Sequence, residues 1–167
     1  MAVAAPSYSG LIPASEASSR VKKNNRRRDT QHEITLRREL WRIGLRFRKN
    51  VSYLPGKPDI VFIKSRVAVF CDGDFWHGRN WTVLNRSLST GTNSGYWLAK
   101  IKSNMKRDAL NNIRLREAGW HVIRLWETDI NRDPISAANF VKNTVRLARQ
   151  HMNVGSKSRR REMGKTQ

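Results

Sequence analysis

The 167-residue chain has little cysteine, few acidic side chains and no long apolar run. Its single cysteine, Cys71, excludes an internal disulfide and a cysteine-rich zinc site. A lone cysteine suits a reducing cytosol, so we expect a cytoplasmic protein. No apolar stretch is long enough to cross a bilayer, so no membrane partner is expected. Only 13 acidic residues stand against 33 basic ones, and the net charge of +20 indicates a polyanionic partner such as a nucleic acid.

Basic residues cluster at both ends of the chain. Residues 1–28 lack apolar periodicity and end in the run Arg26-Arg27-Arg28. We expect residues 1–28 to be a disordered basic arm, residues 29–152 to form one folded domain, and residues 153–167 to be a disordered basic tail. Contact of the arm with DNA phosphates is favoured over a solvated tail, because the chain as a whole is so basic.

Apolar patterns between these ends predict an α/β fold. They place helices over about 30–44, 94–118 and 133–152, and strands over 45–49, 58–63, 67–72 and 120–126. The two middle strands are expected to form an antiparallel hairpin, and the last strand fits a crossover back to the sheet. Residues 78–96 are rich in Ser, Thr, Asn and Gly, which predicts a long loop that closes over a substrate.

The first helix begins with a capping-box pattern, in which Glu33 accepts a hydrogen bond from the amide of Thr30. Glu33 also falls on the inward face of the helix, in line with Leu36 and Leu40. Two interpretations of Glu33 therefore stay open: a helix cap, or an acid of an active site.

The predicted hairpin brings two acids together. Asp59 begins its first strand and Asp72 ends its second, and in an antiparallel pair these ends are neighbours. With the main-chain carbonyl of Cys71 between them, they would supply the oxygen ligands that Mg²⁺ prefers. His77 follows closely, and an imidazole titrates near neutrality, so His77 is the candidate general base for a water molecule.

Asp108 interrupts the apolar stripe of the second predicted helix, where an unpaired charge is unfavourable. It is expected either to form a salt bridge with an arginine or to pair with His77. Structural explanations remain for the other residues as well. An aspartate after proline, as at Asp59, is typical of a strand start, Asp72 and Gly73 form a common turn pair, and a histidine beside Trp76 is ordinarily a packing residue.

An ordered series of motifs resembles the very short patch repair (Vsr) DNA mismatch endonucleases, within the wider PD-(D/E)XK nuclease superfamily. The match covers roughly residues 20–130 and includes Arg28-Asp29-Thr30 with Glu33, Leu54-Pro55-Gly56-Lys57-Pro58-Asp59, Phe75-Trp76-His77-Gly78, Tyr96-Trp97-Leu98-Ala99-Lys100-Ile101, Asn104, Arg107-Asp108, Leu115-Arg116-Glu117-Ala118-Gly119-Trp120-His121-Val122 and Trp126-Glu127. The series as a whole is specific, whereas each motif alone is weak.

The resemblance implies a restriction-endonuclease-like mixed β-sheet flanked by α-helices, and a Mg²⁺-dependent nick beside a T:G mismatch in double-stranded DNA. The family pattern implies a role for each matching residue. These are Asp59 and the Cys71 carbonyl as metal ligands, His77 as the residue that activates water, Asp108 behind it, Glu33 as the acid of the first helix, and Phe75, Trp76 and Trp97 as rings wedged into the base stack. Lys57, Arg26, Arg27 and Arg28 are further expected DNA contacts.

The sequence departs from the family pattern at several positions. Asp72 stands where the best-known member has a second histidine, so it is an additional candidate catalytic residue and metal ligand. Asp74, Arg79 and Trp81 stand where that member has structural zinc ligands. We therefore expect no zinc, and a loop after His77 that packing holds in place.

Two rival functions follow from the same residues. A restriction or homing nuclease would cut without any preference for mismatches, and a non-catalytic basic nucleic-acid-binding protein would not cut at all. A monomer that works with repair proteins is the expected form of the leading hypothesis, the Mg²⁺-dependent mismatch endonuclease.

Overall fold

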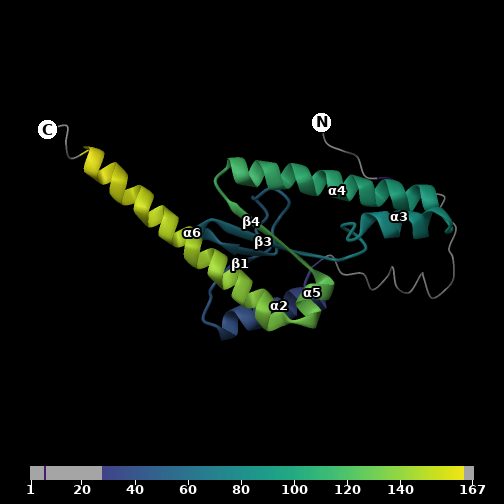
Figure 1. Cartoon of the computed structure of the whole chain (residues 1–167), viewed down its shortest axis with the longest axis horizontal. Helices are drawn as coiled ribbons and strands as arrows, with labels where there is room; N and C mark the ends of the chain where they lie inside the picture. The colour runs from purple at the N-terminus through teal and green to yellow at the C-terminus, as the bar shows by residue number, and fades with distance from the viewer. Residues whose placement is uncertain (1–5, 7–27, 164–167) are drawn as a thin grey trace.

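The computed structural model describes Pro6 and residues 28–163, with side chains as far as Met152. It contains a four-stranded sheet with helices on both faces (Figure 1). The elements are α2 (Gln31–Arg42), β1 (Arg48–Lys49), β2 (Ile60–Phe62), the 3₁₀ turn η1 (Ile63–Ser65), β3 (Val67–Asp72), α3 (Trp81–Ser89), α4 (Ser94–Glu117), β4 (His121–Trp126), α5 (Glu127–Arg132) and α6 (Pro134–Met163). Most of the predicted arm, and the side chains of the predicted tail, lie outside the described residues.

The sheet is mixed, with the strand order β1-β2-β3-β4. β2 pairs with β3 in antiparallel fashion, with Ile60 opposite Val69, which confirms the predicted hairpin. β3 and β4 are parallel, with Asp72 opposite Trp126, and α4 makes the crossover between them. This is the expected restriction-endonuclease-like arrangement, and it brings the ends of β3 and β4 to the same edge of the sheet.

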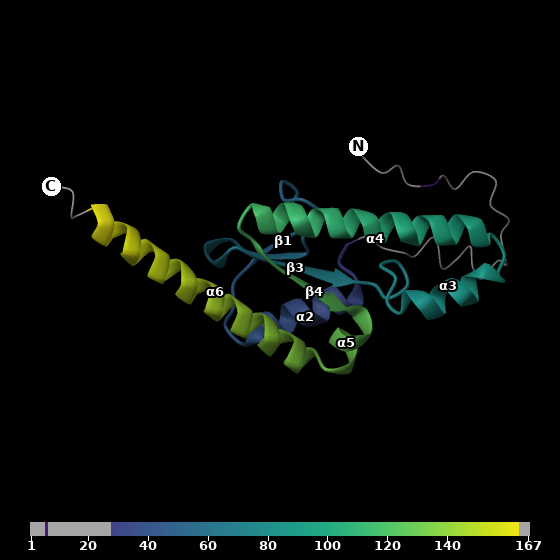
Figure 2. The ribbon, with the colours of Figure 1, turned by 45° about the horizontal axis from the view of Figure 1, so that its top comes forward.

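Alternation along the strands builds a separate core on each face of the sheet. Val67, Val69 and Cys71 of β3 belong to the core formed with α2 and α6, whereas Ala68 and Phe70 belong to the core formed with α4. Figure 2 shows α4 along one side of the sheet, with α2 and α6 along the other. Because side chains alternate between faces, Asp72 points to the α4 side.

Two elements differ from the sequence prediction. Residues 81–89, expected within a long loop, form the helix α3. This segment is a poor intrinsic helix former, but its half-buried Leu84 and Leu88 lie on one side and α3 packs against α4, so tertiary contacts override propensity. The last helix continues past residue 152 to Met163. Within the described part of the chain, no helix has the length and apolar character needed to span a membrane.

Candidate active site

Asp59 lies just before β2, against the end of β3. Its Oδ2 accepts a hydrogen bond of 2.8 Å from the amide of Cys71. Burial raises the pKa of Asp59 to about 7; the Cys71 amide opposes this shift, and the nearby carboxylates of Glu33 and Asp72 add to it. His77 is close enough to lower the pKa slightly. Residues from α2, β3 and the following loop therefore meet around one carboxylate.

The Asp59 carboxylate fits the role of a cation ligand. Among residues 28–152 no arginine or lysine pairs with this half-buried acid, whose pKa is raised to about 7, and a divalent cation can take the place of its proton. The described residues contain no cluster of three or more His, Cys, Asp or Glu side chains arranged for a metal. Mg²⁺ keeps several of its waters, however, so one carboxylate and a main-chain carbonyl are a sufficient protein contribution.

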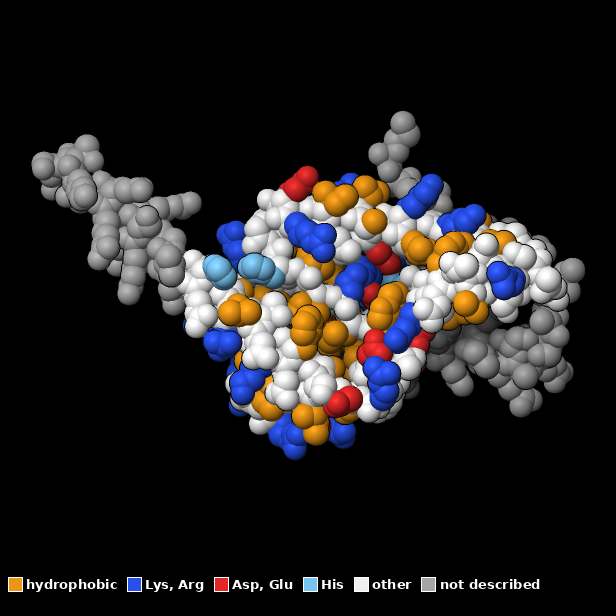
Figure 3. All heavy atoms as spheres, in the orientation of Figure 1, with side chains coloured by type: hydrophobic (Ala, Val, Ile, Leu, Met, Phe, Trp, Pro, Cys, Tyr) orange, Lys and Arg blue, Asp and Glu red, His pale blue; other side chains and the backbone are white. Residues whose placement is uncertain are grey.

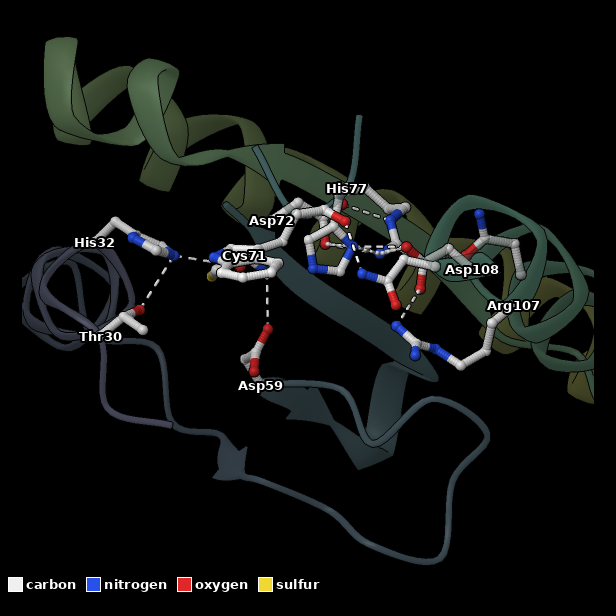
Figure 4. A network of polar contacts seen from close by, with 12 residues as sticks. Thr30, His32, Asp59, Cys71, Asp72, His77, Arg107 and Asp108 are labelled. Carbon is white, nitrogen blue, oxygen red and sulfur yellow. Dashed lines mark hydrogen bonds and ion pairs between the residues drawn. The ribbon is translucent and has the colours of Figure 1, made fainter. Parts of the chain in front are cut away.

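His32 supports the end of β3 from the side of α2. Its Nε2 lies 3.3 Å from the carbonyl oxygen of Cys71 and 3.1 Å from Oγ1 of Thr30 (Figure 4). Because a carbonyl only accepts, Nε2 is the protonated nitrogen in the contact with Cys71. Nδ1 then faces Glu127 at 3.6 Å. Cys71 contributes through its main chain, since burial raises the pKa of its thiol and keeps it protonated.

Glu33 is buried, with 3% of its surface exposed, at the start of α2. Its two oxygens accept hydrogen bonds from the amide of Asp29 at 3.1 Å and from the hydroxyl of Thr30 at 2.8 Å. The predicted donor, the amide of Thr30, is not the one used, so that detail of the capping box is wrong. Glu33 nevertheless anchors the helix start and also contributes negative charge at Asp59.

Asp72 is bound by an arginine. Nε of Arg124 lies 2.5 Å from Oδ2 of Asp72, and Nη2 lies 2.7 Å from Oδ1, a bidentate pair. Nη2 also lies 3.3 Å from Oδ2 of Asp108, and Nη1 donates to Oδ1 of Asn112 at 3.2 Å. Arg124, on β4, therefore joins the end of β3 to the middle of α4. Both carboxylate oxygens of the predicted metal ligand Asp72 are engaged.

His77 and Asp108 form a close pair on the other side of Arg124. Nδ1 of His77 lies 2.6 Å from Oδ2 of Asp108 and 3.6 Å from Oδ1 of Asp72. Both alternatives for Asp108 are thus realised, because it contacts His77 and Arg124 at once. Although burial acts in the opposite direction, these two partners lower the pKa of Asp108. With the Nδ1 proton directed at a carboxylate, Nε2 is left as the proton acceptor.

The loop that carries His77 is fixed at both ends. Gly78 has φ +73°, and a Cβ there would lie 2.6 Å from Sδ of Met105, so only glycine allows this approach to α4. Arg79 bonds Asp129 at 2.9 Å and Asp74 at 3.4 Å, and Thr128 donates to Asp74. The sequence predicts a loop held by packing; ion pairs to α5 also hold it.

The predicted aromatic residues form one cluster. The ring centroid of Phe75 lies 5.1 Å from that of Trp76 and 5.7 Å from that of Trp97, and the two indoles are 5.9 Å apart. Phe75 is 36% exposed, and the main-chain carbonyl of Trp76 accepts a hydrogen bond from Asn104 at 2.9 Å. The cluster joins the loop before His77 to the beginning of α4.

Comparison with known proteins identifies the group to which this site belongs. The model of the family described as DNA mismatch endonuclease Vsr matches residues 13–83. The type II nicking enzyme V.NmeDIP of Neisseria meningitidis serogroup C is 38% identical over 131 residues, which cover 78% of this chain and 87% of that protein. The chain belongs to the Vsr family. It is a DNA endonuclease, a hydrolase of phosphodiester bonds.

Two further Vsr-family relatives show similar identity. The type II nicking enzyme V.NaeI of Lentzea aerocolonigenes is 39% identical over 136 residues, 77% of this chain and 80% of that protein. The DNA mismatch endonuclease Vsr of Escherichia coli is 38% identical over 100 residues, 60% of this chain and 62% of that protein.

The structure brings most of the predicted Vsr-family site together. Six of the predicted residues surround one edge of the sheet: Glu33, Asp59, Cys71, Asp72, His77 and Asp108. Figure 4 shows all of them except Glu33. Figure 3 shows several acidic side chains near the middle of a face otherwise rich in Lys and Arg. Of the expected phosphate contacts, Lys57 and Arg28 are exposed, and Arg26 and Arg27 lie outside the described residues.

Sequence reasoning missed two residues of this site, His32 and Arg124. Arg124 carries a visible signal, since it is the one charged residue in the apolar strand His121–Trp126 and shares a face with Val122. His32 carries none, because its position next to Glu33 gives no hint of a contact with Cys71, 39 residues away.

Proposed function

We propose that this Vsr-family endonuclease nicks one strand of double-stranded DNA beside a T:G mismatch and that it requires Mg²⁺. The observation that supports this most directly is the His77–Asp108 pair at 2.6 Å next to the uncompensated carboxylate of Asp59. A proton acceptor and a cation ligand side by side are the groups that metal-assisted phosphodiester hydrolysis needs.

Asp59 and the main-chain carbonyl of Cys71 would hold the Mg²⁺. When bound there, the ion would neutralise phosphate charge and stabilise the leaving oxygen. Asp72, the third predicted ligand, is assigned instead to its ion pair with Arg124, because both of its oxygens are occupied. His32 fixes the direction of the Cys71 carbonyl by hydrogen bonding to it.

His77 is the proposed general base. Its Nε2 takes a proton from the attacking water, and the charge that develops on the ring is stabilised by Asp108, which already bonds Nδ1. Glu33 lies close to Asp59 and adds to the negative charge that attracts a cation. Asp108 and Glu33 lie on helices, and hydrogen bonds to Asp108 and Cys71 hold the side chains of His77 and Asp59, so little reorganisation is needed.

The aromatic cluster is the proposed source of mismatch preference. Rings inserted between base pairs unstack them at a cost of a few kcal/mol per step, which is lowest where a pair is already weak. Phe75 is the exposed member, and Trp76 and Trp97 back it from two elements. A matched duplex would resist the same insertion. We propose that the enzyme acts as a monomer and that repair proteins process its nicked product.

A single nicking assay tests the function. Matched and T:G duplexes of the same sequence, labelled on either strand, are incubated with and without Mg²⁺. We expect one labelled strand of the T:G duplex to be cut, only with Mg²⁺. Equal cutting of matched duplexes would favour a restriction-type enzyme, and no cutting with either Mg²⁺ or Mn²⁺ would favour a non-catalytic DNA-binding protein.

A further inference from the structure

A solvent-open hollow of about 370 Å³ lies beside the active site, between the loop that precedes Asp59 and helix α4. We call it the basic hollow, and its lining residues are Ser52, Leu54, Gly56, Lys57, Arg107 and Asn111. Two of these are cations and two are neutral hydrogen-bonding residues. Nothing in the proposed reaction uses the hollow so far.

The shape of the basic hollow is set by an unusual backbone. Gly56 and Lys57 both have positive φ, +76° and +54°, and a non-glycine residue in this region is uncommon. A Cβ on Gly56 would lie 3.0 Å from Nδ2 of Asn111 and 3.1 Å from Cε1 of Phe70. A side chain at position 56 would press on Asn111 and Phe70, so glycine favours this close approach of the loop to α4, which places Lys57 at the hollow.

The same two elements supply the active site and the basic hollow. The loop presents Lys57 to the hollow and, two residues later, Asp59 to the active site; α4 presents Arg107 and then Asp108. Residues two apart along an extended chain are separated by about 7 Å at most, which is on the order of one or two nucleotide steps of a DNA strand. Figure 4 shows Arg107 beside Asp108, with the loop passing below it.

The charges of the basic hollow are available to a ligand. Among residues 28–152, Lys57 makes no ion pair, and the one ion pair of Arg107 is a contact of 3.8 Å with Asp108. Arg124 pairs with Asp72 and Asp108, but the Asp59 carboxylate has no arginine or lysine partner among residues 28–152, and its negative charge repels a phosphodiester. Cations at the border of the active site would offset that repulsion for the neighbouring phosphate.

We infer that the basic hollow binds the phosphate, with its sugar, of a nucleotide adjacent to the cut on the nicked strand. Lys57 and Arg107 bind the phosphate oxygens, and Ser52 and Asn111 provide hydrogen bonds beside them. The inference rests on the proposed function, because it places the scissile phosphate next to Asp59. Its role is to set the register of the strand, which positions the bond to be cut.

The test removes charge from protein and DNA in turn. A set of T:G duplexes carries one uncharged methylphosphonate at a time at each phosphate within three of the mismatch on either strand. Fluorescence anisotropy without divalent metal measures the affinity of the full-length protein for each duplex. The variants are Lys57→Ala/Arg107→Ala and, as a control that also removes two exposed cations, Lys142→Ala/Arg149→Ala on α6, across the sheet.

We expect wild-type protein to lose about 10-fold in affinity at one methylphosphonate position in particular, as expected for one charged contact. The Lys57→Ala/Arg107→Ala variant should bind the unmodified duplex about 10- to 30-fold more weakly, lower its salt slope by about 1 to 2, and show no further loss at that position. The Lys142→Ala/Arg149→Ala control should retain the positional loss.

The inference is overturned if the Lys57→Ala/Arg107→Ala variant still loses affinity at the same position, or if it binds as the control does. Both removed side chains are exposed, and equal melting temperatures would confirm that the fold is intact. Because no metal is present, the result does not depend on nicking. Failure of the nicking assay and failure of the basic hollow are therefore separate outcomes.

Discussion

Two carboxylates at the same edge of the sheet, a half-buried Asp59 and a buried Asp72, have opposite surroundings. Asp72 is 3% exposed and is bound on both oxygens by Arg124. Asp59 accepts one main-chain hydrogen bond, and no arginine or lysine forms an ion pair with it among residues 28–152. Burial therefore raises the pKa of Asp59 to about 7, whereas Asp72 has a cation beside it.

The difference assigns the two acids to different tasks. A buried charge is stable when it is paired within the protein, so Asp72 and Arg124 form a structural unit that also positions Asp108 and His77. A buried acid without such a partner is unfavourable unless a ligand supplies the positive charge. Asp59 has no such cation partner among residues 28–152, as expected for a carboxylate that binds a metal ion.

The largest expected effect comes from removing the unpaired acid. Asp59→Asn should lower the nicking rate by about 10⁴-fold, because about 5.5 kcal/mol of transition-state stabilisation depends on the cation. DNA binding should stay within a few-fold of wild type, since a carboxylate does not attract phosphate. Single-turnover nicking and anisotropy titration measure the two quantities. Wild-type-like nicking by this variant would sink the assignment of Asp59.

The ion pair should behave in the contrary way. Arg124→Met leaves Asp72 buried without its cation and should lower the free energy of unfolding by about 3–5 kcal/mol. The second change Asp72→Asn should restore most of that loss, because no charge is then left unpaired. Urea unfolding of the four proteins in this cycle measures the coupling. Additive losses would show that the two residues do not act as a pair.

The pH dependence of metal-free stability distinguishes the acids further. The folded-state pKa of Asp59 is about 7 against an ordinary 3.8, so the folded protein retains this proton more tightly. The stabilising contribution of the Asp59 proton is therefore complete below about pH 4, decreases as the pH rises toward 7, and is lost above that pH. Over that range wild type should lose roughly 2–4 kcal/mol relative to Asp59→Asn.

Unfolding at pH 4, 5.5, 7 and 8 without divalent metal measures this difference. Mg²⁺ should then raise the melting temperature of wild type at pH 8 and leave Asp59→Asn unchanged, because the ion replaces the proton. A parallel pH dependence in the two proteins would contradict the raised pKa of Asp59.

The sequence predicts the acids of this site better than their partners. The hairpin follows from two apolar runs with a polar turn, and it alone brings Asp59 next to Asp72. The bonds of Arg124 and His32 join positions 52 and 39 residues apart. Such pairing depends on the parallel register of β3 with β4 and on the docking of α2, which local patterns do not encode.

Helix α3 is a second feature that local sequence patterns do not encode. It lies within residues 78–96, whose richness in Ser, Thr, Asn and Gly predicts a loop, and its helical form depends on packing against α4. For the aromatic cluster, in contrast, the sequence predicts which residues belong to it but not how their rings are arranged. Phe75 and Trp76 are adjacent in sequence, whereas Trp97 reaches them only because α4 crosses the loop.

The smallest expected effect concerns Asp108, which Arg124 contacts on one side and His77 on the other. Asp108→Asn keeps the shape of the side chain but removes one of the charges that face Nδ1 of His77. Nicking should fall by about 10- to 100-fold, the range for a residue that orients a catalytic group, with unchanged DNA affinity. His77→Ala combined with Asp108→Asn should be no slower than His77→Ala alone, because Asp108 acts through the imidazole. Single-turnover nicking of the three variants measures this, and a multiplicative loss in the double variant would mean that Asp108 contributes independently of His77.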